Sequence, residues 1–476
     1  MTFITQLLII QNMSSPVQRT VDPTEQLCEF VTGVEYNDIP ESVTEHAKLM
    51  IRDTLGVSIA ATKTQPFERI RAAKRQDLNH GLSTARVPGT PIRASLGDAG
   101  LLNGILAHAL DFDDVHPDMG GHPSSPVLSA LLPISEQQNA SGKEFLRAFI
   151  LGTEVEITLA NVLNPGHYER GWHPTAILGT VGAATAVGAL CDQDDDTLRY
   201  AVGIAASQAG GIKANFGTMT KSYHVGRAAR SAIEAAQLAE EGFTSNPDAL
   251  ETDFGGFCDL FQGTPGYDFA DHIEKLGNPW KILSPKVGFK PYPCCGSTHG
   301  AIDAALAIRE NLDGNLDLEC VKSIEIEEHP RRLGHTNRPY PRTPLDAKFS
   351  VQYCVTSALR NGDVWFDHFT LEAVEGDRQN VPLDRVTIQE RPEEFANDDW
   401  GAEVIVRLTD GTEESVRIPA PKGSADNPMT DKELEHKYGR CVAHVLPKER
   451  ASESISLFER LENLDDVTEL LDVLTS

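Results

Sequence analysis

The segment 101–136, LLNGILAHALDFDDVHPDMGGHPSSPVLSALLPISE, constrains the fold of this chain more than any other. Its apolar residues recur at helical spacing as far as Leu110, which predicts a helix that ends near Asp113. Proline and glycine then break the pattern, and an apolar run resumes over 127–134. The sequence therefore predicts a helix that gives way to a loop rich in glycine and proline.

Three carboxylates and two histidines lie at this transition. On a helical wheel His108, Asp111 and Asp114 share the polar half with Asn103, whereas Asp113 falls in the apolar half and would need a buried partner. Loops on a rigid scaffold commonly carry catalytic groups. A capped helix end with a solvated acidic turn explains the same residues equally well.

The length and charge of the chain exclude several classes of protein. A chain of 476 residues is too long for one ordinary core and predicts two domains. The formal net charge of −28 argues against nucleic acid and against an anionic membrane surface, because no basic patch is available for phosphates. Such an acidic composition leads us to expect a salt-adapted source organism.

Cysteine spacing and the N-terminus bear on the cellular compartment. The eight cysteines contain no C-x-x-C pair, which predicts free thiols in a reducing compartment. The apolar run near the N-terminus is too short to span a bilayer and has no basic residues before it. Met13 is a possible alternative start. We expect a cytoplasmic protein.

The remaining patterns predict a mainly helical chain with an α/β lid. Residues 24–284 and 425–476 are expected to form one large all-helical domain, built from both ends of the chain. Residues 285–424 are expected to form a smaller inserted α/β domain. There, 321–329 alternates as a strand does, 349–362 reads as a helix closed by glycine, and 403–418 reads as a hairpin.

Two helix starts carry basic side chains. His173 precedes Pro174, a favourable first-turn residue, and the helix that follows has a smooth face of glycine and alanine. Its glycines are not a dinucleotide loop, because no strand precedes them. Lys221 and His224 share one face of a helix that starts near Thr220, where the helix dipole disfavours cations. An anionic ligand would explain both residues.

Seven segments are distinctive in their order along the chain: DTLGVSIA (53–60), HALDFDDVHPDMGGHPSS (108–125), GWHPTAILGT (171–180), TKSYHVGRAAR (220–230), FKPYPCCGSTHGAIDAAL (289–306), AKFSVQY (347–353) and DNPMTDKELEHKY (426–438). Together they resemble the MmgE/PrpD family, which includes 2-methylcitrate dehydratase, cis-aconitate decarboxylase and iminodisuccinate epimerase. The resemblance extends from about Leu27 to Tyr438.

This resemblance implies a helical large domain with an α/β lid, a homodimer, a small di- or tricarboxylate substrate, and neither a metal nor an organic cofactor. It also implies an active site between the two domains. The residues that match the catalytic positions of the family are Asp111, His122, His173, Lys221 and Lys290. The residues expected to contact substrate are His224, Cys295, His299 and His335.

Three of these positions depart from the pattern of cis-aconitate decarboxylase. Val115 replaces a threonine, Cys295 replaces a histidine, and His335 corresponds to a tyrosine. These differences argue against that decarboxylase activity. A dehydratase is the expected enzyme, and an epimerase that uses the same proton abstraction is the second choice.

The residue types fit this chemistry. Proton removal next to a carboxylate needs a base, for which His122 and His173 are the candidates, and loss of a hydroxyl also needs an acid. Lys221 and Lys290 can balance the developing enediolate charge, while Asp111 can orient a histidine. We expect Asp113 to be structural, and Cys294 and Cys295 to be buried apolar side chains rather than nucleophiles.

Three other interpretations compete with this one. Asp113, Asp114 and Asp118 could bind magnesium in a helical prenyl-diphosphate enzyme, although the sequence has no convincing second acidic cluster. A zinc site could draw its ligands from His108, Asp111, His116, His122 and Cys295. A family member without turnover is the third possibility, because three site positions differ.

Overall fold

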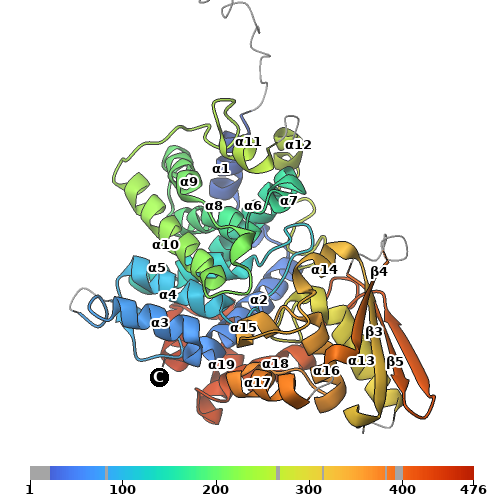
Figure 1. The fold of residues 1–476 in the computed structure, drawn as a ribbon. Coiled ribbons are helices and arrows are strands. Elements are labelled where there is room, and N and C mark those ends of the chain that lie inside the picture. The colour runs from blue at the N-terminus through green and yellow to red at the C-terminus, as the bar shows by residue number, and fades with distance from the viewer. Residues whose placement is uncertain are drawn as a thin grey trace, which may run out of the picture.

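A computed structural model describes residues 22–80, 84–263, 268–312, 316–380, 383–391 and 400–475. The apolar N-terminal run and Met13 lie outside the described residues. The chain is mainly helical and has one α/β portion, which confirms the fold class expected from the sequence (Figure 1). None of the described helices is both long and apolar enough to cross a membrane.

The first part of the chain supplies most of the helical portion. Its helices are α1 (Pro23–Gly33), α2 (Glu41–Ala60), α3 (Gln65–Lys74), α4 (Leu96–His108), α5 (Ser124–Gln138), α6 (Gly142–Leu163), α7 (Gly166–Glu169), α8 (Pro174–Leu190), α9 (Asp195–Gln208), α10 (Thr220–Glu240), α11 (Phe257–Gln262) and α12 (Phe269–Ile273). A short antiparallel ribbon, β1 (Ala85–Arg86) with β2 (Arg93–Ala94), lies between α3 and α4. This ribbon corrects the expectation of an all-helical domain.

The end of the chain completes the helical portion with α18 (Asp431–Val442), α19 (Lys448–Glu459) and α20 (Thr468–Leu474). Helix α18 packs on α2. One large core joins side chains from both ends of the chain, from Leu27 in α1 to Leu474 in α20. Because both ends bury apolar residues in one core, they complete the helical portion together.

The α/β portion lies between these two parts in sequence. Its strands are β3 (Val321–Glu328), β4 (Val386–Glu390), β5 (Ala402–Leu408) and β6 (Glu413–Ile418), and its helices are α13 (His299–Asn311), α14 (Pro330–Thr336), α15 (Pro344–Ala347), α16 (Val351–Asn361) and α17 (Leu371–Asn380). The sheet order is β4-β3-β5-β6, with β3 and β4 parallel and the other pairs antiparallel.

This sheet has its own core. Alternate residues of β5 are buried, and they pack with α13 and α16 in a second cluster that includes Ile324, Val404 and Tyr353. Figure 1 shows the sheet at the opposite end of the molecule from α9 and α10. The domain limits 24–284, 285–424 and 425–476 stay a prediction.

Helix α4 differs from the amphipathic helix expected from the sequence. It ends at His108, and both its apolar and its polar faces are buried, with Asn103 only 3% exposed and His108 only 2%. The reason is that α10, α5 and α2 all pack around it. The helix therefore delivers the segment that follows it, 109–123, into the interior of the molecule.

Candidate active site

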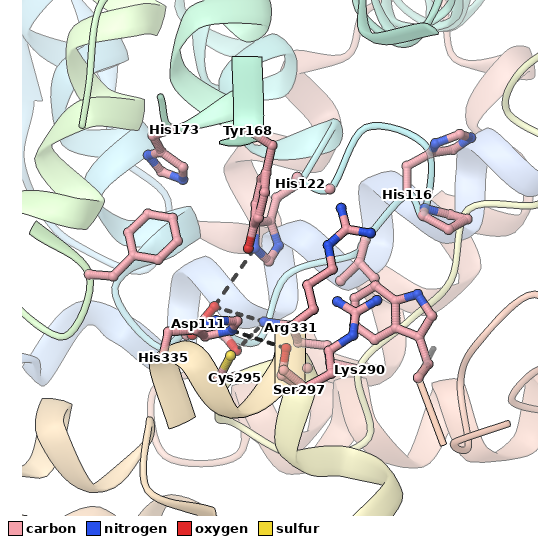
Figure 2. Close-up of a pocket in the computed structure, with 18 of the residues that line it drawn as sticks. Asp111, His116, His122, Tyr168, His173, Lys290, Cys295, Ser297, Arg331 and His335 are labelled. Carbon is pink, nitrogen blue, oxygen red and sulfur yellow. Dashed lines mark hydrogen bonds and ion pairs between the residues drawn. The ribbon is translucent and has the colours of Figure 1, made fainter. Parts of the chain in front are cut away.

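A cavity of about 180 Å³ lies between the helical portion and the α/β portion (Figure 2). One side of the cavity is formed by the loop that follows α4, by the start of α8 and by the start of α10. The other side is formed by the loop that precedes α13, by α14 and by Trp400. The chemically reactive residues of its lining are Asp111, His116, Asp118, His122, Tyr168, His173, Lys221, Lys290, Cys295, Ser297, Arg331, Arg332 and His335.

Asp111 is the centre of the charged part of this cavity. Its Oδ1 accepts from Lys221 Nζ at 2.9 Å and from Lys290 Nζ at 2.7 Å. Burial alone would raise the pKa of this carboxyl, but the two ammonium groups hold it well below its ordinary value. Burial would likewise lower the pKa of Lys290, which the Asp111 carboxylate raises instead. Asp111 and Lys290 are therefore held in their charged forms.

Three lysines hold the backbone of residues 110–112, the segment that contains Asp111. The carbonyl oxygens of residues 110, 111 and 112 each accept from one ammonium group, at 2.7 Å from Lys348, 2.9 Å from Lys290 and 2.9 Å from Lys437. Asp111 itself has a φ of 54°, a left-handed conformation that a non-glycine residue adopts at a cost of order 1 kcal/mol. The three charge-assisted bonds offset this cost and aim the Asp111 carboxylate at the cavity.

His122 lies next to this ion cluster. Its Nδ1 lies 2.7 Å from the carbonyl oxygen of Asp114, so Nδ1 carries the proton and donates it. Nε2 then carries no proton and presents its lone pair, at 3.8 Å from Asp111 Oδ1. Burial lowers the pKa of His122 to about 3, which keeps the imidazole neutral. A neutral imidazole has a lone pair on Nε2 that can accept a proton.

His108 and Asp113 form a buried pair behind His122. His108 Nδ1 donates to Asp113 Oδ2 at 2.7 Å, and Ser125 donates to the same carboxylate. Burial would raise the pKa of Asp113, but His108 and His122 lower it. The ring centroids of His108 and His122 are 4.7 Å apart. Asp113 is thus buried with a partner, and through His108 it supports the ring of a candidate base.

His108, Asp113 and His122 are also close enough to one another to hold a metal ion. One ligand atom each of His108, Asp113 and His122 lie within 4.8 Å of one another. In the described part of the chain, His116 and Cys295 do not join this group, and His116 Nε2 instead lies 3.2 Å from the carbonyl oxygen of Lys281. The five-residue zinc set considered from the sequence is therefore not assembled as one site.

His173 lines the cavity above the ion cluster. It is the residue before Pro174 at the start of α8, as the sequence predicts, and its Nδ1 lies 3.2 Å from His224 Nδ1 on α10. Burial lowers the pKa of His173 well below its ordinary value and that of His224 to about 4. Within the described residues, His173 Nε2 has no hydrogen-bond partner, so it is free for a ligand.

The α/β portion adds cations and hydrogen-bonding groups on the opposite side. His335 Nε2 lies 3.1 Å from Ser297 Oγ, and burial lowers the pKa of His335 to about 4. Arg331 and Arg332 both line the cavity, and the guanidinium of Arg332 lies 3.5 Å from the centroid of Trp400. Burial raises the pKa of the Cys295 thiol to about 11, so the thiol is protonated near neutral pH and is a poor nucleophile.

The structure brings together most of the residues singled out from the sequence. The cavity is lined by Asp111, His122, His173, Lys221, Lys290, Cys295 and His335. His224 stands behind His173, and His299 lines a neighbouring cavity instead. Asp111 contacts two lysines at hydrogen-bond distance rather than the histidine that it was expected to orient. The catalytic and substrate-binding roles of all nine residues stay a prediction.

Several lining residues were not found from the sequence. Arg331, Arg332, Tyr168 and Trp400 carried no pattern that separates them from surface residues, because they reach the cavity only through long-range packing. The one available signal was Arg331-Arg332 directly after a proline, four residues before His335.

Comparisons with known proteins identify the family of this chain. The chain matches the MmgE/PrpD N-terminal domain over residues 25–270 and the MmgE/PrpD C-terminal domain over residues 292–463. It is 28% identical to cis-aconitate decarboxylase of Mus musculus over 468 residues, which cover 95% of this chain and 93% of that protein. The Homo sapiens cis-aconitate decarboxylase is also 28% identical, with 95% and 94% covered.

A more partial match is an alkylcitrate dehydratase of a fungal species, 27% identical over 234 residues, or 46% of this chain and 45% of that protein. The two domain matches together span most of the chain in the family order, so this protein belongs to the MmgE/PrpD family.

Proposed function

We propose that this protein is a lyase that removes water from a small di- or tricarboxylic acid such as 2-methylcitrate, without a metal or an organic cofactor. The observation that carries the proposal is the Lys221–Asp111–Lys290 cluster beside the neutral, unprotonated Nε2 of His122. Cations that receive carboxylate charge and a base that removes the adjacent proton are the two requirements of this reaction.

The lysines retain hydrogen-bond donors for a substrate. An ammonium group has three N–H donors. Lys221 Nζ uses one of them on Asp111 Oδ1, and Lys290 Nζ uses two, on Oδ1 and on the backbone oxygen. Each lysine can therefore donate to a substrate carboxylate while it keeps its bond to Asp111. When the α-proton leaves, the negative charge moves onto the carboxylate oxygens that these donors contact.

We assign the base to His122, which also returns the proton to the leaving group. His122 Nε2 takes the proton from the carbon next to the carboxylate, and its Nδ1–H bond to the Asp114 carbonyl keeps the tautomer fixed. Expulsion of the hydroxyl from the neighbouring carbon needs a proton. Because the lowered pKa of His173 keeps that imidazole neutral, the proton that His122 Nε2 has taken up is handed to the departing hydroxyl, while His173 faces the same cavity from the start of α8 as a hydrogen-bonding group. The carbon–carbon double bond then forms as the C–O bond breaks, and the hydroxyl leaves as water.

Arg331 and Arg332 are proposed to bind a second or third carboxylate. They line the cavity on the same side as Lys290 and opposite Lys221, across the boundary of the two portions. Cations on both sides suit a substrate with carboxylates at both ends. Because guanidinium groups contact carboxylates through two parallel N–H bonds, they also fix its orientation.

The relatives support lyase chemistry on an acid of this class, since they are named cis-aconitate decarboxylase and alkylcitrate dehydratase. Decarboxylation of cis-aconitate is the second candidate, because the decarboxylases match along 95% of this chain. The three positions at which the sequence departs from the decarboxylase pattern, Val115, Cys295 and His335, all line the cavity. We therefore place dehydration first and epimerisation of a related acid third.

A single substrate panel tests the proposal. The purified protein is incubated in deuterium oxide with citrate, 2-methylcitrate, cis-aconitate, malate and succinate derivatives, and the products are analysed by mass spectrometry. Loss of water from a hydroxy acid supports the dehydratase, release of carbon dioxide identifies a decarboxylase, and deuterium exchange at constant composition identifies an epimerase. If no acid reacts and none shifts the melting temperature, the protein is a family member without turnover, and the proposal is wrong.

A further inference from the structure

A second cavity, of about 210 Å³, adjoins the candidate active site. The two cavities share a partition made of Val115, Pro117, Asp118, Lys290, Gly296 and Trp400. Because Lys290 is part of this partition, the second cavity begins next to the group that is proposed to hold a substrate carboxylate.

The chemistry of the second cavity is different from that of the first. Its wall is mainly apolar, from the side chains of Val115, Pro285, Phe289, Trp400, Pro421 and Ala425. The ammonium of Lys290 is directed to Asp111 in the first cavity, and that of Lys422 is paired with Glu433 at 2.9 Å. Carboxylates of a substrate would have few cations to meet here, whereas a hydrocarbon group would leave water for an apolar surface.

This cavity is built by backbone hydrogen bonds between distant segments. The backbone N–H groups of Val115 and Gly288 each donate to the carbonyl oxygen of the other at 2.9 Å, and Phe289 N–H donates to the Gly423 carbonyl oxygen at 2.9 Å. The wall therefore has a fixed shape before any ligand arrives, so a ligand group does not have to order it.

Two partition residues, Gly296 and Val115, border both cavities. A Cβ atom added to Gly296 would lie 3.4 Å from the ring of Trp400 and 3.8 Å from Lys290 Cε. The missing side chain at position 296 thus keeps space beside the lysine and the tryptophan. Val115 presents an apolar side chain to both cavities.

From this geometry we propose that the second cavity binds an alkyl substituent of the substrate, so that the preferred acid carries a hydrocarbon chain longer than methyl. The proposal rests on the function proposed above and extends it to a substrate class. With its carboxylates on Lys221, Lys290 and the arginines, such an acid directs its chain past Val115 and Gly296 into the apolar compartment.

A series of citrates with methyl, ethyl, propyl and butyl substituents at one position tests this inference. Each methylene buried in the cavity should raise kcat/KM about fourfold, the factor that corresponds to transfer of one methylene out of water. Ala425 lines the second cavity and not the first, so the variant Ala425→Leu takes up space in the second cavity without replacing any residue of the first. We expect this variant to lower the butyl-to-methyl ratio of kcat/KM at least tenfold.

A matched variant controls for the added side chain. Ala443 is exposed at the end of α18, and Ala443→Leu should keep the wild-type butyl-to-methyl ratio. If kcat/KM falls steadily with chain length while the methyl acid is converted, the inference is wrong and the proposed function stands. If Ala425→Leu slows all members equally, the cavity is a passage for the substrate and the inference is also wrong. If no member of the series is converted, the proposed function is wrong, and the inference that rests on it is wrong as well.

Discussion

Asp111 is the residue on which the candidate site depends most. Its side chain is 4% exposed and its backbone φ is in the left-handed region. One of its carboxylate oxygens accepts hydrogen bonds from two ammonium groups. A buried carboxylate in this position is stable only while it is paired. The charge of the site is therefore set before a substrate arrives, and the two lysines are held at fixed positions by the same anion.

The first prediction concerns His122. His122→Gln keeps a hydrogen-bonding side chain but removes the base, so kcat should fall by about 100-fold to 10,000-fold with little change in KM. Initial rates and α-deuterium exchange measure the loss. His116 lines the same cavity, but its Nε2 lies 3.2 Å from the Lys281 carbonyl oxygen, so His116→Gln should retain most of kcat. Equal losses in the two variants would remove His122 from the role of base.

The second prediction concerns Lys221. Lys221→Met takes away one of the two ammonium partners of Asp111, so the free energy of unfolding should fall by about 3 kcal/mol and activity by about 100-fold or more. From the sequence alone, a lysine at a helix start is expected to leave folding nearly intact when replaced. The structure changes that expectation, because Lys221 is only 7% exposed and is bonded to Asp111.

The double variant Lys221→Met with Asp111→Asn separates the two effects. It removes the unpaired charge and should recover much of the lost stability, measured by urea unfolding. Activity should stay low, because a substrate carboxylate still lacks the Lys221 ammonium. Recovery of turnover in the double variant would show that Lys221 serves only to neutralise Asp111.

At the level of elements, α4 and α10 cross at unusually close range. A Cβ atom on Gly104 would lie 2.7 Å from Gly226 Cα, and one on Gly226 would lie 2.4 Å from the Leu101 carbonyl oxygen. Two glycines thus allow the helix that precedes Asp111 to pack against the helix that carries Lys221. This contact sets the distance between the two charged side chains.

The third prediction tests this crossing. Gly104→Ala places a methyl group against backbone atoms, so the helices must separate, and we expect a loss of about 1–3 kcal/mol of unfolding free energy. Gly439 lies inside α18 with no atom within 4 Å of an added Cβ, so Gly439→Ala should be neutral or stabilising. Urea unfolding compares the two. A neutral Gly104→Ala would mean that the crossing adjusts freely.

The fourth prediction concerns α18, which lies outside the cavity lining. Lys437 Nζ is bonded to the Phe112 carbonyl oxygen at 2.9 Å and to Asp53 at 2.7 Å. Lys437→Met should lower the unfolding free energy by about 3–5 kcal/mol and reduce kcat, because a buried Asp53 loses its partner and the Asp111 segment loses one anchor. Lys432 is exposed on the same helix, and Lys432→Met should match wild type in both measurements.

The elements that could be predicted from sequence are those with a local signal. The helix over 142–163, the helix start at Pro174 and the hairpin around Asp410 and Gly411 are confirmed, because caps, proline and turn residues encode them locally. Strand β4 was not predicted, since its pairing with β3 joins residues about 60 positions apart. The three lysine–carbonyl contacts were also not predicted, because nothing in a sequence shows which backbone oxygen a distant lysine will reach.

The candidate site was predicted from the sequence to a different extent. The family resemblance singled out the charged centre, but the interpretation of its parts changed with the structure. Asp113 has a buried histidine partner that the helical wheel only suggested, and Asp111 pairs with lysines rather than with a histidine. Such pairings depend on how three parts of the chain meet, which residue spacing does not contain.

For the whole molecule, buried titratable groups make stability depend on pH in two directions. His46 is buried in the large core and its pKa is lowered to about 4. Between pH 6.5 and 4 the unfolded chain binds a proton at this residue that the folded chain does not, so stability is present above pH 6.5 and is lost as pH falls. Glu328 is the opposite case, because burial raises its pKa to about 8.

The fifth prediction concerns the pH dependence that His46 and Glu328 each cause. As pH falls from 6.5 to 4.5, wild type should lose about 2–3 kcal/mol of unfolding free energy relative to His46→Gln, since each pH unit contributes about 1.4 kcal/mol. As pH rises from 5 to 8, wild type should instead lose stability relative to Glu328→Gln, because the folded state retains a proton that the unfolded state releases. Urea unfolding at each pH checks both slopes, and parallel curves for wild type and variant would contradict them.

The three lysines on successive carbonyl oxygens also set an order of events during synthesis. Lys290 and Lys348 belong to the middle of the chain, and Lys437 lies close to its end. A nascent chain still attached to the ribosome holds Asp111 and His122 long before α18 has emerged. The carbonyl oxygens of residues 110–112 therefore acquire their lysine partners one after another during synthesis, and the partner of the Phe112 carbonyl oxygen is made last of the three.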